Sequence, residues 1–450
     1  MKKRQKIEIL IMAFMLLCSV LLVSLLSTHQ FSSHEVRVKN FFAEEKDTID
    51  VVHVGASEMY AGFSPEYIWK NYGITSYNLA TAGAPMGLAK SEVEAAIENQ
   101  HPKLIVISLN GAVYGNKRAI HEGYTRMWLD NMPSSKIHDG AIDDLIKDHK
   151  LTYKFKMLKY HDNIARLPEC ISLTNRELKA KKDKELLTIS GIQGQACTDD
   201  RDLSKIVDGK NYTQEEKLGK ITNMQLYDLL VYLKENKVDN VIFVNMPRFY
   251  EERMFESKRR INTAAKIVKA YGYPVYDFDN DVDKIGLDPK NDFYNFSHLN
   301  AYGQQKMSKY FYEQVVPKYV TGVNRNSYSE DVQKRWDENY DAYTKVYQWI
   351  SKTIDEKSQY KIQYDYKVVD HILAGTIDKY EKVAIKKAEV RIEKDKKKEA
   401  KRQKEWEKRK KEEEQNPLPK PEPKRKAKTV PPAQDIKKPP KPPVDDTNKE

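Results

Sequence analysis

The sequence predicts an α/β fold with an open parallel sheet of about five strands and helices on both of its faces. Short apolar runs alternate with stretches of helical length from residue 49 to residue 316. The run at residues 104–109 is almost continuously apolar, which is typical of a strand buried on both faces of a parallel sheet. Right-handed connections between such strands place helices on both faces, so we expect three layers.

The amino terminus predicts a transmembrane helix. Residues 1–6 form a basic segment with four positive charges, and residues 7–27 are apolar apart from Glu8. A run of this length can cross a bilayer, and basic residues before it favour an N-terminus inside the cytoplasm. A cleaved signal peptide is the alternative, but the residues after the apolar run make a poor cleavage site. We therefore expect a single-pass cell-membrane protein whose folded part is extracytoplasmic.

The first half of the predicted domain follows in order. Residues 28–47 are interpreted as a polar stalk, and β-branched residues then predict the first strand at 49–54. Ser64 and Pro65 predict the start of a helix, because serine can cap it and proline suits its first turn. The remaining elements of this half are a strand at 76–80, a helix at 87–99 and a strand at 104–109.

The second half follows a long interruption. Residues 112–218 show a pattern of helices and loops rather than strands, and they are interpreted as a helical insertion. The alternation resumes with helices at 221–235, 251–271 and 300–316 and with strands at 241–246 and 274–278. One α/β domain over residues 48–320, with the insertion inside it, accounts for all these elements.

Two segments of different composition follow the domain. Residues 321–380 carry aromatic side chains at helical spacing, which predicts a helical extension packed on the core. Residues 381–450 begin with a charged run that is either a solvated helix or a disordered segment. Ten prolines interleaved with lysines between Pro417 and Pro443 then favour a disordered, extended tail.

The formal net charge of +11 does not describe the folded part. Residues 381–450 contribute +9 and residues 1–6 contribute +4, which leaves about −2 for residues 7–380. Nucleic-acid binding would rest on the tail alone, and we expect none. Outside the cytoplasm, a basic tail suits anionic envelope polymers, with solvation and no partner as the alternative.

The sequence predicts no cofactor and no metal site. There is neither a P-loop nor a dinucleotide-binding glycine pattern. The histidines of the insertion lack the tight spacing of zinc ligands; they are His121, His138, His149 and His161. Cys170 and Cys197 either form a disulfide or remain free thiols, and the sequence leaves both possibilities open.

A serine and a histidine are the candidate reacting groups. Ser57 directly follows the first strand, so we expect it at the carboxyl edge of the sheet. His298 lies in a loop between the last strand and the last helix. We expect this loop at the same edge of the sheet as Ser57. A serine hydroxyl is a weak nucleophile and needs a base such as histidine within hydrogen-bond reach. The other ring nitrogen needs a partner in turn, for which Asp292 and Asn295 are the candidates.

Four positions together resemble the signature of SGNH hydrolases, the GDSL-like esterase superfamily. They are Ser57 after the first strand, Gly83 after the second, Asn110 after the third and His298 in the final block. The resemblance covers residues 49–316 apart from the insertion, and it implies a flavodoxin-like three-layer fold. With its anchor and its HLNAYG block, the chain is similar to membrane-anchored members that handle acyl groups on bacterial cell-envelope polymers. Some of these, including proteins for D-alanylation of teichoic acid and for alginate acetylation, work beside membrane-bound O-acyltransferases.

The resemblance implies a role for each position. Ser57 would be acylated with His298 as the base, and the oxyanion would be held by the backbone amides of Ser57 and Gly83 and the side-chain amide of Asn110. The chain departs from the family at Asn295, where the family has aspartate, because an amide cannot balance a protonated imidazole. Ala56 likewise replaces the aspartate of a literal GDSL motif, a position that is not the nucleophile.

We therefore expect an outward-facing serine esterase or O-acyltransferase that acts on an acyl group of an envelope polysaccharide or glycolipid. Both reactions pass through the same acyl-serine and differ in whether water or a sugar hydroxyl attacks it. The alternative is a catalytically weak scaffold of an acyl-transfer complex, with the anchor, the insertion and the tail as docking surfaces. A third hypothesis, an adhesion module that binds the cell wall, predicts that deletion of residues 381–450 abolishes function.

Overall fold

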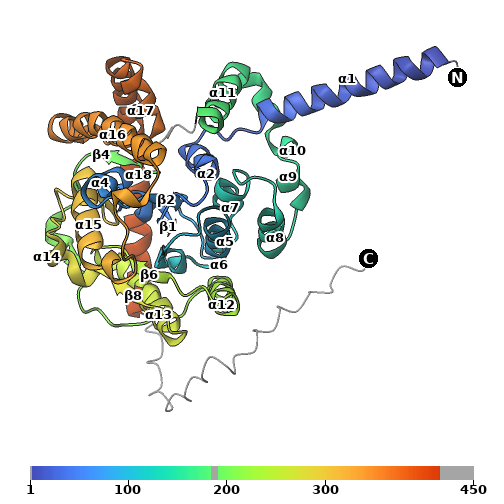
Figure 1. The fold of residues 1–450 in the computed structure, drawn as a ribbon. Helices are drawn as coiled ribbons and strands as arrows, with labels where there is room; N and C mark the ends of the chain where they lie inside the picture. The colour runs from blue at the N-terminus through green and yellow to red at the C-terminus, as the bar shows by residue number, and fades with distance from the viewer. Residues whose placement is uncertain (1–2, 184–190, 416–450) are drawn as a thin grey trace, which may run out of the picture.

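The computed structural model describes residues 3–183 and 191–415. At its centre lies a five-stranded parallel sheet with the strand order β2-β1-β3-β6-β8 (Figure 1). The strands are β1 (Val51–Gly55), β2 (Ser76–Ala80), β3 (Leu104–Ser108), β6 (Val241–Asn245) and β8 (Val275–Asp277). The predicted parallel sheet is confirmed. The strand order reverses between β1 and β3, and ligands of open parallel sheets bind at the carboxyl ends of the strands beside such a reversal.

Alternate residues of the central strands enter two separate cores. Ile105 and Ile107 of β3 join the first core, and Leu104 and Val106 join the second. The helices that bury side chains in the first core include α5 (Leu88–Gln100), α12 (Lys220–Glu235) and α13 (Phe255–Ala270). The second core is covered by α15 (Ala301–Gln314). Helices therefore lie on both faces of the sheet.

Local signals determine where two helices begin and end. α4 (Pro65–Tyr72) ends at Gly73, whose φ of 63° lies in the left-handed region that glycine adopts without strain. A Cβ at Gly73 would also lie 2.6 Å from the backbone nitrogen of Arg325. α15 begins after Asn300, whose side chain accepts hydrogen bonds from two backbone amides of the first turn. This cap fixes the end of the loop that carries His298.

The segment at residues 28–47 is not a stalk, contrary to the prediction. It contains α2 (Ser33–Ala43), whose Val38 and Phe41 are fully buried in the first core. Arg37 of the same helix is buried as well, and its Nε donates to the backbone oxygen of Gly191 at 2.9 Å. The polar composition was misleading because these polar side chains are buried in hydrogen bonds rather than solvated.

The insertion contains helices, as predicted, and two short strands that were not predicted. Its helices are α6 (Asn116–Ala119), α7 (Glu122–Leu129), α8 (Lys136–Leu145), α9 (Lys150–Lys154), α10 (Met157–Tyr160) and α11 (Leu167–Asp183). The short strands are paired as β4 (Gly194–Ala196) with β11 (Ile362–Tyr364) and β5 (Val207–Asp208) with β7 (Phe249–Tyr250). Strands of this length show no alternating pattern that a sequence could reveal. Cys170 and Cys197 are free, buried thiols.

The extension packs on the domain, as predicted. Trp336 of α16 (Glu330–Lys357) is fully buried in the first core, with its ring centroid 5.9 Å from that of Trp69. The chain continues through α17 (Tyr366–Leu373) into α18 (Ile377–Gln415). The charged run is therefore helical as far as residue 415, and its Glu399 pairs with Arg253 of the domain. The predicted disordered proline-rich tail, residues 416–450, lies outside the described residues.

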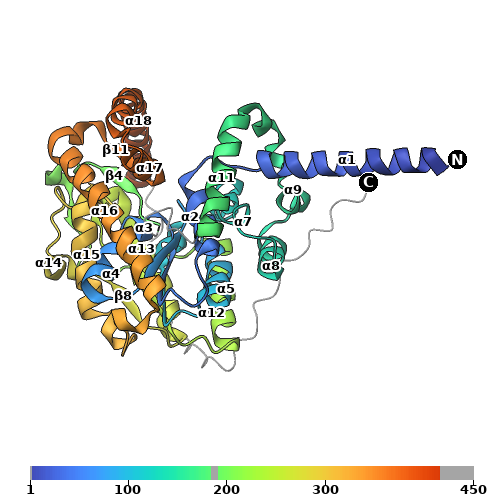
Figure 2. The same cartoon turned by 45° about the horizontal axis from the view of Figure 1, so that its top comes forward.

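The first helix, α1 (Lys3–Ser27), extends away from the folded part (Figure 2). Its stretch from Arg4 to Ser27 is long and apolar enough to cross a membrane, a test of length and composition that a signal sequence also passes. At its end, Asn163 Nδ2 donates to the backbone oxygens of Ser27 and His29 at 3.1 and 2.5 Å. The helix therefore joins the domain beside the insertion.

A buried carboxyl group on α5 gives a prediction for stability. Glu92 is 1% exposed, and neither of its carboxyl oxygens has a hydrogen-bond partner among the described residues. Burial, and secondly the nearby Glu58, raise the pKa of Glu92 well above its ordinary 4.5. The folded state therefore binds this proton more tightly than the unfolded state does. Its contribution to stability is complete below pH 4.5 and is lost as the pH rises toward the raised pKa.

We expect Glu92→Gln to remove this pH dependence, because the amide does not ionise. Between pH 5 and the raised pKa, the wild type should lose about 1.4 kcal/mol of unfolding free energy per pH unit relative to the variant. Denaturant unfolding over a series of pH values measures the difference. Glu98→Gln, at an exposed position of the same helix, is the control and should follow the wild type. Parallel wild-type and Glu92→Gln curves would contradict the prediction.

Candidate active site

The structure brings the predicted serine and histidine together. Ser57 is the first residue of α3 (Ser57–Tyr60), directly after β1, and His298 opens β10 (His298–Leu299). Although they are 241 positions apart in the chain, the Oγ of Ser57 and the Nε2 of His298 lie 2.7 Å apart. A hydroxyl and an imidazole at this distance are placed for proton transfer.

Asn295, and not Asp292, contacts the other ring nitrogen. The Oδ1 of Asn295 accepts from the Nδ1 of His298 at 2.8 Å and from the backbone amide of Ser297 at 3.1 Å. The Asp292 carboxylate instead accepts from the Nζ of Lys306 and from the Asp288 amide, each at 2.7 Å. The amide oxygen of Asn295 can only accept a hydrogen bond, so the proton of the neutral ring is assigned to Nδ1 of His298. Nε2 is then free to accept a hydrogen bond from Ser57.

The surroundings of His298 keep its ring neutral. The ring of Tyr294 stacks on the imidazole, with centroids 5.2 Å apart and an interplanar angle of 12°. Burial, and secondly the positive charge of Arg248, lower the pKa of His298 from 6.5 to about 3. At neutral pH the imidazole is therefore unprotonated, which is the form that a general base requires.

Glycines allow the strand ends at this edge to turn and to approach closely. Gly55 precedes Ser57 by two residues, and a Cβ there would lie 2.5 Å from the Cβ of Ser108. Gly83 lies in the turn after β2 with a φ of 61°, and a Cβ there would lie 2.7 Å from Arg118 of the insertion. The predicted oxyanion position Gly83 thus lies at the same sheet edge, covered by a side chain from α6.

The side-chain amide of Asn110, the third predicted oxyanion donor, is held in a buried network. Its Nδ2 donates to the carboxyl group of Glu58 at 2.9 Å and lies 3.3 Å from the hydroxyl of Tyr114. Its Oδ1 accepts from the Nη2 of Arg248 at 2.6 Å. The second carboxyl oxygen of Glu58 accepts from Ser108 Oγ. To donate to an oxyanion, the Asn110 amide would have to exchange one of these bonds.

Glu58 and Arg248 are the site residues that the sequence reasoning missed. Both are almost fully buried, and burial raises the pKa of Glu58 while Arg248 opposes that shift. The Nε of Arg248 has no hydrogen-bond partner within the described parts of the chain. Two signals could have drawn attention to them. Glu58 directly follows Ser57, and Arg248 follows β6, whose carboxyl end lies at the same edge.

A groove opens beside Asn295. It has a volume of about 580 Å³ and lies between the domain and α18, with Phe296, Arg253 and Trp406 in its wall. A cavity of about 610 Å³ lies between β11, α17 and α18, and it is lined by none of the site residues named above. Of these two cavities, only the groove is lined by a residue that binds His298, namely Asn295.

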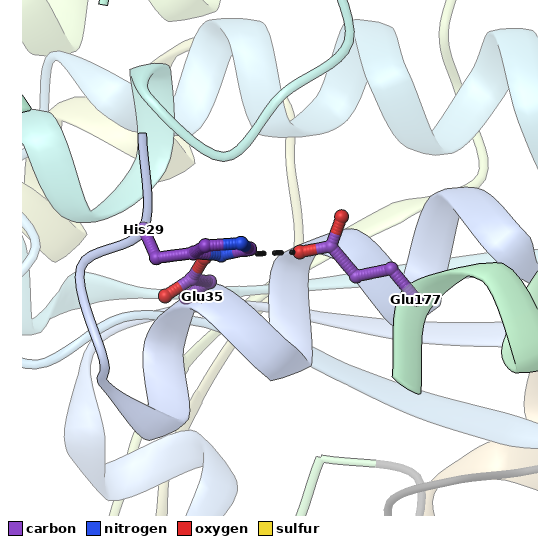
Figure 3. A group of neighbouring side chains, drawn as sticks. All are labelled: His29, Glu35 and Glu177. Atoms are coloured by element: carbon purple, nitrogen blue, oxygen red, sulfur yellow. Dashed lines mark hydrogen bonds and ion pairs between the residues drawn. The ribbon is translucent and has the colours of Figure 1, made fainter. Parts of the chain in front are cut away.

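A second polar cluster joins α2 to α11. Figure 3 shows His29, Glu35 and Glu177, whose candidate metal-ligand atoms lie within 4.8 Å of one another. His29 Nδ1 is 2.6 Å from Glu35 and 3.6 Å from Glu177. The ammonium group of Lys39 contacts both carboxylates, at 2.8 and 2.5 Å. Since the ammonium group already bridges the two carboxylates, the cluster is suited to hold the two helices together.

The site combines a serine, a neutral imidazole with an oriented tautomer and a buried positive charge at one sheet edge. Such an arrangement can attack an ester carbonyl and stabilise the negative charge that develops on its oxygen. No protein-family model matches the chain, and no curated protein matches it either.

Proposed function

We propose that this protein is a membrane-anchored, extracytoplasmic SGNH-type serine esterase or O-acyltransferase. Its substrates would be acyl groups of a cell-envelope polysaccharide or glycolipid. The observation that carries the proposal is the 2.7 Å contact between Ser57 Oγ and His298 Nε2 at the carboxyl edge of the parallel sheet. α1 would be the anchor, with the basic residues before it on the cytoplasmic side.

The reaction begins when His298 Nε2 accepts the hydroxyl proton and Ser57 Oγ attacks the ester carbonyl carbon. The carbon–oxygen bond to the leaving alcohol then breaks, and the imidazolium returns the proton to that alcohol. Ser57 is left as an acyl ester. Water or a sugar hydroxyl attacks this ester with the same proton transfers, which releases a free acid or a transferred acyl group.

The backbone amides of Ser57 and Gly83 and the Nδ2 of Asn110 are the proposed donors to the oxyanion. Arg248 contributes in two ways. Its hydrogen bond to Asn110 Oδ1 orients the amide, and its charge favours negative charge nearby. Because Arg248 is 3% exposed, water screens this charge poorly.

A fluorophosphonate probe tests the proposal, because it reacts with an activated serine and remains attached. We expect the full-length protein in detergent to be labelled on the peptide that contains Ser57, as read by mass spectrometry. Ser57→Ala should not be labelled, whereas Ser204→Ala, at an exposed serine, should be labelled like the wild type. Labelling that survives in Ser57→Ala would refute the assignment. In a separate reaction with an acyl-ester substrate, added glycan acceptors distinguish transfer from hydrolysis, because transfer yields an acylated glycan and hydrolysis yields a free acid.

The pH dependence of turnover tests the charge of Arg248. Wild-type kcat/KM should fall only as the pH approaches about 3, because His298 is an active base above that value. Arg248→Met should move this acid limit upward but leave it below pH 6.5, because burial, the larger cause, remains. Arg248→Lys retains the charge and should move the limit less. Identical pH profiles for the wild type and Arg248→Met would contradict the prediction.

Two observations favour a second candidate, a catalytically weak scaffold of an envelope acyl-transfer complex. Asn295 carries no charge to balance an imidazolium, and the Asn110 amide is already bound to Glu58. In that case the anchor, the insertion and α18 would bind partners such as a membrane-bound O-acyltransferase. The scaffold predicts that Ser57→Ala complements a deletion strain as well as the wild type does.

A further inference from the structure

The insertion exposes a group of large apolar side chains, here called the insertion patch. Each is between 38% and 62% exposed: Leu151, Phe155, Leu158, Ile164, Leu167 and Ile171. They belong to α9, α10, α11, the short η2 helix (His161–Arg166) and the links between them. Single exposed apolar residues are common on soluble proteins, but a succession of six within 21 residues of one segment indicates a surface that is normally covered.

The insertion patch surrounds the point where α1 joins the domain. Asn163, which binds the backbone oxygens of Ser27 and His29, is followed directly by Ile164. The guanidinium of Arg166 lies 3.7 Å from the ring centroid of Phe31, and Leu167 is the next residue. Figures 1 and 2 both show α9 and α11 beside the domain end of α1. Any bilayer that α1 crosses would therefore end within a few residues of the patch.

The charge around the patch is basic, unlike that of the rest of the domain. Residues 147–171 contain six Lys or Arg residues, two Asp residues and one Glu residue, a net charge of +3, whereas residues 7–380 together carry about −2. Three of these cations are partly offset, because Lys150 pairs with Asp143 at 2.7 Å, Lys159 with Glu122 at 3.2 Å and Arg166 with Glu169. Basic residues interleaved with exposed apolar ones are typical of segments that lie in a membrane interface.

We propose that the insertion patch rests on the anionic lipid surface of the bilayer that α1 spans. Its apolar side chains enter the boundary between headgroups and acyl chains, and its lysines and Arg166 lie among the headgroups. This contact fixes the orientation of the domain. The helix that follows the α1 junction also contacts the site helix, because Arg37 of α2 lies 4.1 Å from the centre of the ring of Tyr60, in the same short helix as Ser57. The inference depends on retention of α1, not on catalysis by Ser57.

Fluorophores at defined positions test this contact in the full-length protein. Leu158→Cys and Ile164→Cys are labelled with an environment-sensitive dye in a Cys18→Ser background and placed in nanodiscs. The two lipid mixtures are phosphatidylcholine alone and equal parts phosphatidylcholine and phosphatidylglycerol. We expect a blue shift at both positions and about two-fold quenching by lipids spin-labelled near the headgroup. The anionic mixture should give the larger effect, and added salt should reduce it.

Val207→Cys is the matched control, since Val207 is 53% exposed but lies on β5, which pairs with β7 next to Arg248. Its label should show the spectrum of an aqueous site in both mixtures. The same measurements in a Ser57→Ala background should be unchanged, which separates this inference from the proposed catalysis. If the labels at residues 158 and 164 match the Val207 label in both mixtures, the proposal is wrong and a protein covers the patch instead.

Discussion

Ser57→Ala and His298→Ala are each expected to lower kcat for an activated aryl ester by a factor of about 10⁴ or more. In the proposed mechanism the serine supplies the nucleophile and the histidine accepts its proton, so removal of either would leave only the binding and oxyanion contributions. The contact between Ser57 Oγ and His298 Nε2 makes the two side chains one catalytic unit. We therefore expect the double variant to be no slower than the slower single variant.

Steady-state kinetics of the two single variants and the double variant measure this non-additivity. Ser204→Ala serves as the control for loss of a hydroxyl elsewhere, and thermal unfolding checks that each variant remains folded. Independent, multiplying losses would show that the serine and the histidine act in separate steps. Full turnover by Ser57→Ala would refute Ser57 as the nucleophile, whereas complementation of a deletion strain by Ser57→Ala would favour the scaffold.

The sheet and the meeting of the reacting pair could be predicted from the sequence for one physical reason. Buried parallel strands produce long apolar runs, and their carboxyl ends meet at one edge. Ser57 directly follows the first strand, and His298 lies between the last strand and the last helix. Their proximity therefore followed from the topology of the sheet. The strand at residues 76–80 was predicted with its observed bounds.

Other features depend on tertiary contacts that leave no periodic signal. Asn295 and Asp292 are equally polar neighbours in the sequence, and only the antiparallel pairing of β9 (Phe293–Asn295) with β10 brings Asn295 to the imidazole. Lys306, fourteen residues farther on, pairs with Asp292 instead. α2 was misread because its buried polar side chains find partners from distant segments, such as Gly191 for Arg37. The role of Glu58 and Arg248 becomes apparent from their hydrogen bonds, because both side chains bind the side chain of Asn110.

Asn295→Asp is expected to raise kcat by about 10- to 100-fold, because it gives the imidazolium the charged partner that it lacks. Aspartate can accept both hydrogen bonds that Asn295 accepts, from His298 Nδ1 and from the Ser297 amide. The new carboxylate should also raise the pKa of His298 above about 3, so the acid limit of kcat/KM should move upward. The partial exposure of residue 295 limits both effects, since water screens the charge.

Asn291→Asp is the matched control, because it introduces the same charge at an exposed position of the same segment. It should change neither kcat nor the pH profile. A rise in kcat for Asn295→Asp, together with a shifted acid limit, would show that the natural chain operates with a weakened base and retains a complete catalytic geometry. If Asn295→Asp leaves both quantities unchanged, charge balance at Nδ1 does not limit the reaction. The next candidate for a limit on the rate would then be the Asn110 amide, where Glu58 competes with the oxyanion.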